Sequence, residues 1–176
     1  MKGIYLASYT AYHPGYDIDY QDINGKRDLP GDMMDYDLRN YDFIIATPPC
    51  NWWSRANYRR NTSEYALSTK HLLPDILHKL CEINKPWIVE NVRNKKQFQE
   101  HGLLNLPCFV YFVGRHTYWS SIRLKLSDID VLQHAITDYK NGKKRYLSSQ
   151  NLPREKRQGG TEVHQVIERF LKTIHL

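Results

Sequence analysis

Short apolar runs alternate with polar, turn-rich segments along most of this chain, and their lengths indicate the elements that we expect. Brief runs of apolar and aromatic residues bounded by Pro, Gly, Asn or Asp are typical of strands. This pattern predicts strands over residues 2–7, 16–20, 43–46, 87–89, 108–113 and 119–126. The first two lie so close together that the first forty residues have little room for helices.

A different rhythm, with apolar residues three and four positions apart, marks the helices. It extends over residues 63–84, where Pro74 must start, kink or divide the helix. A second stretch, residues 161–174, begins with Thr161 as a helix cap, and residues 128–139 fit a short helix. Strand, helix and strand in succession predict an α/β fold, folded as one domain over the whole chain.

Composition describes an ordinary globular protein, with 41% hydrophobic and 25% charged residues among 176. No apolar stretch approaches the roughly 20 residues that span a bilayer, and no signal peptide is recognisable. Cys50, Cys81 and Cys108 are odd in number and lack C-x-x-C spacing, which argues against a disulfide framework or a zinc site. The eight histidines show no ligand spacing either. We therefore expect a cytoplasmic protein with no metal and no membrane partner.

A net charge of +6 favours a polyanionic partner. Basic and aromatic side chains gather just after Cys50, at Trp52, Trp53, Arg55, Tyr58, Arg59 and Arg60. Such side chains can stack on bases and neutralise phosphates. This segment therefore predicts a nucleic acid as a partner.

Two reactive side chains follow buried strands. Cys50 comes after the strand at 43–46, held at a stiff turn by Pro48 and Pro49. Glu90 directly follows the next buried strand, where an unpaired carboxylate is costly to bury. A right-handed βαβ unit makes these strands parallel, with both carboxyl ends at one edge. The thiolate can then attack an electron-poor heterocycle while the carboxyl protonates a ring nitrogen.

The residues around these two positions resemble motifs of the DNA (cytosine-5) methyltransferases. Thr47-Pro48-Pro49-Cys50, with Ser54 four positions on, is similar to the family's Pro-Pro-Cys motif and the loop after it. Glu90-Asn91-Val92 is similar to its Glu-Asn-Val motif, and Arg157-Gln158-Gly159-Gly160 resembles its closing Gln-x-Gly-Asn segment. The likeness is to the short, phage-type members. It implies an abbreviated Rossmann-like methyltransferase sheet with flanking helices and no separate target-recognition domain.

The resemblance implies methylation of cytosine C5 in DNA with S-adenosylmethionine. Cys50 would add to C6 of the base, and Glu90 would hold N3 and donate a proton there, which makes C5 nucleophilic. The base would be bound by Pro48, Pro49, Trp52, Trp53, Ser54, Arg55, Asn91, Val92 and Arg115. The base must be flipped out of a duplex or already single-stranded.

Cofactor residues are expected near the first strands. Asp17 or Asp19, near the end of the second predicted strand, is expected to bind a ribose, and the resemblance adds Asp32 and Pro48. The family's first strand leads into a glycine-rich loop, whereas residues 5–12 of this chain contain no glycine. Each Cβ there restricts both φ and the approach of a ligand.

Two alternatives stay open. In one, Cys50 and Glu90 modify a pyrimidine base or nucleotide with another one-carbon donor, or with none. In the other, a catalytically degenerate chain binds DNA or a partner methyltransferase through its basic and aromatic loop. The missing glycine loop favours these two. An abbreviated N-terminal part also suggests a homodimer or a partner subunit that covers the sheet edge.

Overall fold

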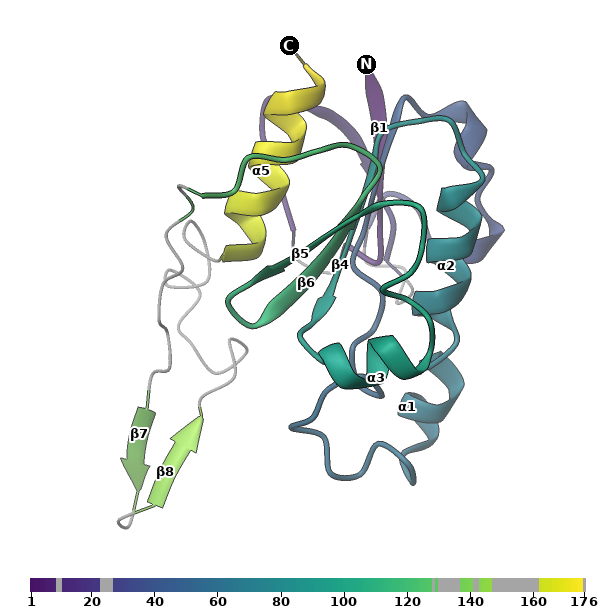
Figure 1. Cartoon of the computed structure of the whole chain (residues 1–176). Coiled ribbons are helices and arrows are strands. Elements are labelled where there is room, and N and C mark those ends of the chain that lie inside the picture. Colours follow the sequence, from purple (N-terminus) through teal and green to yellow (C-terminus); the bar gives the residue numbers. More distant parts are fainter. Residues whose placement is uncertain are drawn as a thin grey trace.

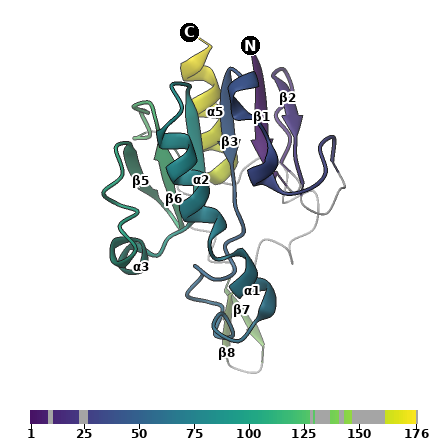
Figure 2. The same ribbon diagram turned by 90° about the vertical axis from the view of Figure 1, so that its right-hand side faces the viewer.

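The computed structural model describes residues 1–8, 11–22, 27–127, 129, 137–140, 143–146 and 162–175. A mixed six-stranded sheet forms the centre of this part of the chain, in the order β2-β1-β3-β4-β6-β5. Helices cover both faces, with α2 on one and α5 on the other (Figures 1 and 2). The predicted α/β fold with flanking helices is confirmed.

Four parallel strands and an antiparallel hairpin make up the sheet. The strands are β1 (Lys2–Leu6), β2 (Asp17–Tyr20), β3 (Phe43–Ala46), β4 (Trp87–Val92), β5 (Phe109–Val113) and β6 (His116–Ser120). β1 to β4 are parallel, whereas β6 runs antiparallel to β4 and β5. β1 lies between β2 and β3, so the direction of strand succession reverses at this point. In open α/β sheets, ligands bind beside the carboxyl ends of the strands at such a reversal.

Within the described residues the helices are short except for α5. They are η1 (Met33–Asp35), η2 (Leu38–Asn40), α1 (Glu64–Thr69), α2 (Leu72–Cys81), α3 (Lys95–Glu100) and α5 (Glu162–Ile174), where η marks a single 3-10 turn. A separate two-stranded sheet pairs β7 (Thr137–Lys140) with β8 (Lys143–Tyr146).

The 63–84 stretch, in which Pro74 was expected to start, kink or divide the helix, forms two helices. Ser63 caps α1, its hydroxyl accepting the amide of Ala66, and α1 ends at Thr69. Pro74 is the third residue of α2. A proline is tolerated in the first helical turn because its missing amide would have no partner inside the helix there.

Three predicted elements differ from the structure. The strand expected over 87–89 continues to Val92, so Glu90 lies inside β4 rather than after it. The strand expected over 119–126 instead starts at His116 and ends at Ser120, because Gly114 and Arg115 form a tight hairpin turn that brings the chain back along β5. Residues 137–139, expected at the end of a short helix, belong to β7. The predicted helix cap Thr161 and the segment 157–160 lie outside the described residues.

The core has one layer on each face of the sheet. Every residue of β3 is buried, as expected for a central parallel strand covered on both sides. Ile44 and Ala46 pack with α2, whereas Phe43 and Ile45 face α5. Helix α5 buries Val166, Ile167, Phe170 and Leu171 in that second layer. No helix within the described residues is long and apolar enough to cross a membrane.

Gly3 provides a test of this packing. A Cβ at Gly3 would overlap the buried ring of Phe43, which is held in edge contact with Phe170 and His175. We therefore expect Gly3→Ala to lower the free energy of unfolding by roughly 1–3 kcal/mol, the usual cost of overpacking. Urea denaturation measures the change. In a double-mutant cycle with Phe43→Leu the two losses should be less than additive; additive losses would contradict the proposed overlap.

Candidate active site

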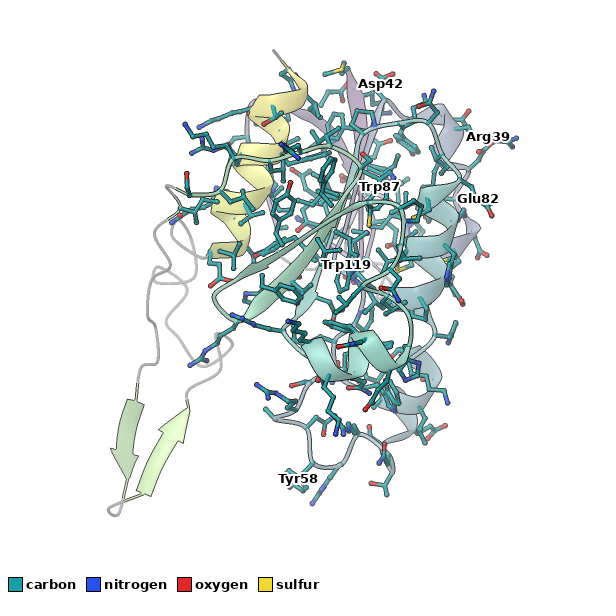
Figure 3. The ribbon with its side chains drawn as sticks, viewed as in Figure 1. Arg39, Asp42, Tyr58, Glu82, Trp87 and Trp119 are labelled. Carbon is teal, nitrogen blue, oxygen red and sulfur yellow. The ribbon has the colours of Figure 1, made fainter. Side chains whose placement is uncertain are left out.

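The candidate site lies at the edge of the sheet where β1, β3 and β4 end. In Figure 3, Tyr58 marks the loop after Cys50 on this side, whereas Asp42, next to the N-terminal residues, marks the opposite edge. The register pairs Ile44 with Trp87 and Ala46 with Val89. Since both strands run in the same direction, the segments that follow them emerge side by side.

A buried hydrogen bond joins the two predicted motifs. The side-chain amide of Asn91 donates to the carbonyl of Pro48 over 2.9 Å, and its oxygen accepts the amide of Val92. Asn91 is only 1% exposed. An unpaired buried carbonyl would cost about 1–3 kcal/mol, so this bond holds the proline turn against the end of β4. Asn91 thus positions the proline turn through this hydrogen bond. Val92, the next residue, is half-buried.

The Cys50 thiol is close enough to Glu90 for their charges to interact. Burial raises the pKa of the Cys50 thiol to about 11, and the Glu90 carboxylate adds to the shift. The pKa of Tyr65 on α1 is also raised, by burial first and then by the charges of Cys50 and Asp22. Cys50 is therefore a protonated thiol in the free protein, and a bound substrate or base must assist its deprotonation.

Glu90 has a neighbour that the sequence analysis did not single out. Its side chain lies on the α5 face of the sheet with His116 of β6, whose Nε2 is 3.8 Å from Glu90 Oε1. On its other side His116 contacts Glu162 of α5, with Nδ1 2.8 Å from Oε1. The imidazole thus lies between two carboxylates.

Burial favours a neutral acid at Glu90. Burial alone would lower the pKa of His116, but the hydrogen bond to Glu162 and the charges of both glutamates outweigh it and raise the pKa. Burial raises the pKa of Glu90, assisted by Glu162 and partly opposed by His116. A protonated His116 paired with Glu162 leaves Glu90 able to hold a proton, which is the property of a general acid.

A glycine lets Glu162 reach His116. Gly114 in the hairpin turn has φ +51°, and a Cβ there would overlap the Glu162 carboxylate. The sequence does not distinguish Glu162 from any other acidic residue in the first turn of a helix. For His116, the one available signal was the alternation of side chains along β6, which places it on the same face as its neighbours two residues on. Arg115 itself is exposed; its carbonyl accepts the Arg93 amide over 2.7 Å, and its charge lowers the pKa of His116.

The aromatic loop after Cys50 is anchored by Asn94, whose side-chain amide donates to the Trp53 carbonyl (2.7 Å) and to Gln97 (2.6 Å). Trp53 is 1% exposed and packs on Phe98. The expectation that Trp53 binds the base is therefore corrected: its indole fills the core between the loop and α3. Trp52 is half-buried and lies edge-on against it.

Other predicted substrate residues lie in the same turn. The Ser54 amide donates to the Cys50 carbonyl over 2.8 Å, which closes the turn, and the Ser54 hydroxyl accepts the Ala56 amide. Pro49 is half-buried and Arg55 is exposed. The structure thus brings Pro48, Pro49 and Ser54 around Cys50.

A cationic groove of about 490 Å³ opens between this loop and α3. It is lined by Trp52, Arg55, Arg60, Arg93, Asn94, Lys95, Lys96, Gln97, Glu100 and His101. Lys96 and Glu100 form an exposed i,i+4 pair at 4.0 Å, which leaves four further cations. Trp52 is two residues from Cys50 and Arg93 three from Glu90 in the sequence, whereas neither Cys50 nor Glu90 itself lines the groove.

Asp17 and Asp19 lie away from Cys50, and the expectation for them is corrected. Asp17 opens β2 rather than ending it and pairs in register with Lys2. Asp19 is bound to the Lys2 ammonium at 2.9 Å and accepts the Tyr41 hydroxyl. Asp32 caps η1 by accepting the Met34 amide. The acid beyond the carboxyl end of β2 is Asp22, 3% exposed, which the sequence analysis did not consider.

The turn after β1 keeps a glycine-like shape without glycine. Ala7 has φ 52°, a conformation that non-glycine residues rarely adopt. The Ala7 amide donates to the Gln21 side chain (2.7 Å) and the Ser8 amide to the Gln21 carbonyl (2.8 Å). The Thr47 hydroxyl bonds the Ala7 carbonyl, which ties this turn to the motif that contains Cys50. The amides at this turn are thus satisfied internally.

Comparison with known proteins gives a distant structural likeness. No family model matches the chain, and no curated protein matches it. Among solved structures, the Entamoeba histolytica methyltransferase EhMeth is similar at 18% identity and a TM-score of 0.41. The match covers 71% of this chain and 54% of that one, so the chain spans about half of that structure. A likeness this distant does not assign a function.

The raised pKa of Cys50 predicts slow alkylation. In a Cys81→Ser/Cys108→Ser background, iodoacetamide should react at pH 8 roughly 100-fold more slowly than with an unperturbed thiol, because each pKa unit lowers the thiolate fraction about tenfold. The rate should rise with pH up to about 11. A rate profile with its midpoint near 9, followed by mass spectrometry, would contradict this electrostatic account.

Gly114 can be used to test the contact between Glu162 and His116. Gly114→Ala should push the Glu162 carboxylate away and lower the pKa of His116, which NMR titration of the ring measures directly. Gly102→Ala is the matched control: its φ of +73° carries a similar backbone penalty, but nothing lies within 4 Å of its Cβ. An equal His116 pKa in both variants would show that Glu162 does not control the imidazole.

Proposed function

We propose that this protein methylates cytosine C5 in DNA through a covalent adduct with Cys50, using S-adenosylmethionine. The observation that carries the proposal is the pairing of a positioned thiol with an acid whose pKa is raised, at adjacent ends of β3 and β4. Neither group alone is diagnostic. Together they supply the nucleophile and the proton that addition to a pyrimidine ring requires.

The chemistry follows from those two groups. Cys50 loses its proton to solvent or substrate-bound water, and its sulfur forms a bond to C6 of the ring. Glu90 gives its proton to N3, which absorbs the electron pair displaced from the C5–C6 double bond. C5 then becomes nucleophilic. After substitution at C5, loss of the C5 proton and release of the thiolate restore the double bond, and N3 returns its proton to Glu90.

His116 and Glu162 support the acid in this proposal. The ion pair between them is held on the same face of the sheet as Glu90. A cation beside Glu90 would stabilise the carboxylate that forms when its proton moves to N3. His116 therefore acts as a positioning and electrostatic residue rather than as the donor to the ring.

The cationic groove supports a nucleic-acid substrate. Arg55, Arg60, Arg93 and Lys95 line it together with the half-buried ring of Trp52. Phosphates supply the charge that such a cluster attracts, and an aromatic face can stack on an unpaired base. A base extruded from a strand lying in this groove would enter the site beside Cys50.

The residues beyond β2 suit a methyl donor better than the turn after β1 does. Buried Asp22 beyond β2 is suited to a ribose diol, and Pro48 and Thr47 border the same reversal in the sheet. The turn after β1 fits less well, since Gln21 already occupies the amides of Ala7 and Ser8. When bound, the donor would supply an electrophilic methyl group for C5.

This satisfied turn also favours a second candidate. The same thiol and acid could act on a pyrimidine base or nucleotide with a different one-carbon donor, since the addition step needs only Cys50 and Glu90. The protein could therefore form the Cys50 adduct without using S-adenosylmethionine. The experiment has to report adduct formation and use of this donor separately.

Covalent trapping tests the proposal. A pool of single- and double-stranded DNA containing 5-fluorocytosine is incubated with protein, with and without S-adenosylmethionine. Fluorine at C5 prevents proton loss after methyl transfer, so we expect a stable protein–DNA adduct only with the donor. A second pool containing pyrimidin-2-one, whose C6 is more electrophilic, should form an adduct without any donor.

Matched variants locate the adduct. Cys50→Ser should abolish it, whereas Cys108→Ser should leave it unchanged. An adduct on pyrimidin-2-one alone would reject S-adenosylmethionine and favour the second candidate. No Cys50-dependent adduct on either pool would sink both enzymatic candidates and leave a DNA-binding protein.

A further inference from the structure

A second cluster of potential ligands lies outside this site. His13, in the segment between β1 and β2, has Nδ1 2.9 Å from Oε1 of Glu168 in α5. His164 Nε2 is 3.9 Å from the same carboxylate oxygen. One ligand atom from each of the three residues lies within 4.8 Å of the others. The sequence analysis predicted no metal because His13 is separated from Glu168 by 155 positions.

The fold explains why these residues meet. His164 and Glu168 are one helical turn apart, so their side chains share a face of α5. That face flanks the apolar stripe of α5 and lies against the segment after β1. His13 is 2% exposed, and its backbone amide donates to the Tyr20 hydroxyl over 2.8 Å. Burial and this hydrogen bond therefore hold the imidazole of His13 in place.

The ring of His13 is held between two aromatic neighbours. It stacks on Tyr5 with centroids 5.9 Å apart and on His164 at 4.7 Å, with an interplanar angle of 6°. Burial lowers the pKa of His13, more than the hydrogen bond to Glu168 raises it. The imidazole is therefore neutral at physiological pH, the form that binds a metal.

We propose that His13, His164 and Glu168 bind a divalent transition-metal ion of the zinc class, which links the segment after β1 to α5. Two imidazoles and one carboxylate are a ligand set that zinc and its neighbours prefer over Mg²⁺ or Ca²⁺. Three protein ligands leave a position for water. This proposal does not depend on the proposed methylation.

The distances permit the site with small movements. Ligand atoms around a tetrahedral ion are about 3.3 Å apart, given metal–ligand bonds of about 2.0–2.2 Å. The His13–Glu168 pair is already closer than that. His164 and Glu168, with side chains 37% and 23% exposed, have room to adjust, whereas buried His13 provides the fixed point. The ion would replace the hydrogen bond between His13 and Glu168.

Metal titration of the full chain provides the test. The protein is stripped with EDTA, dialysed, and titrated calorimetrically with ZnCl₂. We expect one ion per chain with micromolar or tighter affinity, and a higher melting temperature in the presence of zinc. His164→Ala and Glu168→Gln should each weaken binding at least tenfold. Both residues are partly exposed, so the variants are expected to fold. His78→Ala, which removes an exposed histidine of α2, should have no effect.

The thiols are excluded as ligands by spectroscopy. Co²⁺ bound to nitrogen and oxygen gives visible bands without the near-ultraviolet absorption of cobalt–thiolate bonds. Zinc binding that survives His164→Ala but disappears in Cys81→Ser or Cys108→Ser would place the ion on the cysteines and overturn the proposal. The absence of binding to the parent protein at millimolar zinc would overturn it as well.

Discussion

Parallel pairing of β3 with β4 determines where the reactive side chains meet. The two strands are joined by α1 and α2, and their register ends with Ala46 beside Val89. Beyond this point β3 gives way to the Pro-Pro-Cys turn, whereas β4 continues to Val92 in its pairing with β6, so that Glu90 lies within β4 beside the turn. The buried bond from Asn91 to Pro48 makes that proximity rigid. The loop after Cys50, the groove beside it and the contact of Glu90 with β6 all depend on this arrangement.

The local pattern of apolar and polar residues was sufficient to predict the parts of the site that lie within one βαβ unit. Cys50 and Glu90 could be placed together from two apolar runs, one helical rhythm and the handedness of crossover connections. The same reasoning could not find Glu162, because its contact with His116 depends on how α5 docks across the sheet. Trp53 was misassigned for a related reason: its burial is decided by Phe98 and Asn94, some forty residues further along the chain.

The acids near β2 show that a correct strand boundary does not by itself identify a ligand. The predicted and observed strands both end at Tyr20, yet Asp17 and Asp19 lie within β2, whereas Asp22 lies two residues beyond its end. The sequence analysis named the two acids inside the strand and missed the one that follows it. A boundary error did matter in the hairpin of β5 and β6, since a start at His116 rather than Trp119 brings a titratable ring beside Glu90.

Helix α5 has a consequence for the order in which the site is completed during synthesis. Cys50 and Glu90 leave the ribosome early, and the strands that carry them can pair while the rest of the chain is still being made. Glu162 and the apolar face of α5 follow more than seventy residues after Glu90. Until then one face of the sheet is uncovered and His116 lacks its partner. The nascent chain would thus hold the turn that carries Cys50 before His116 acquires its contact with Glu162, which forms only when α5 docks.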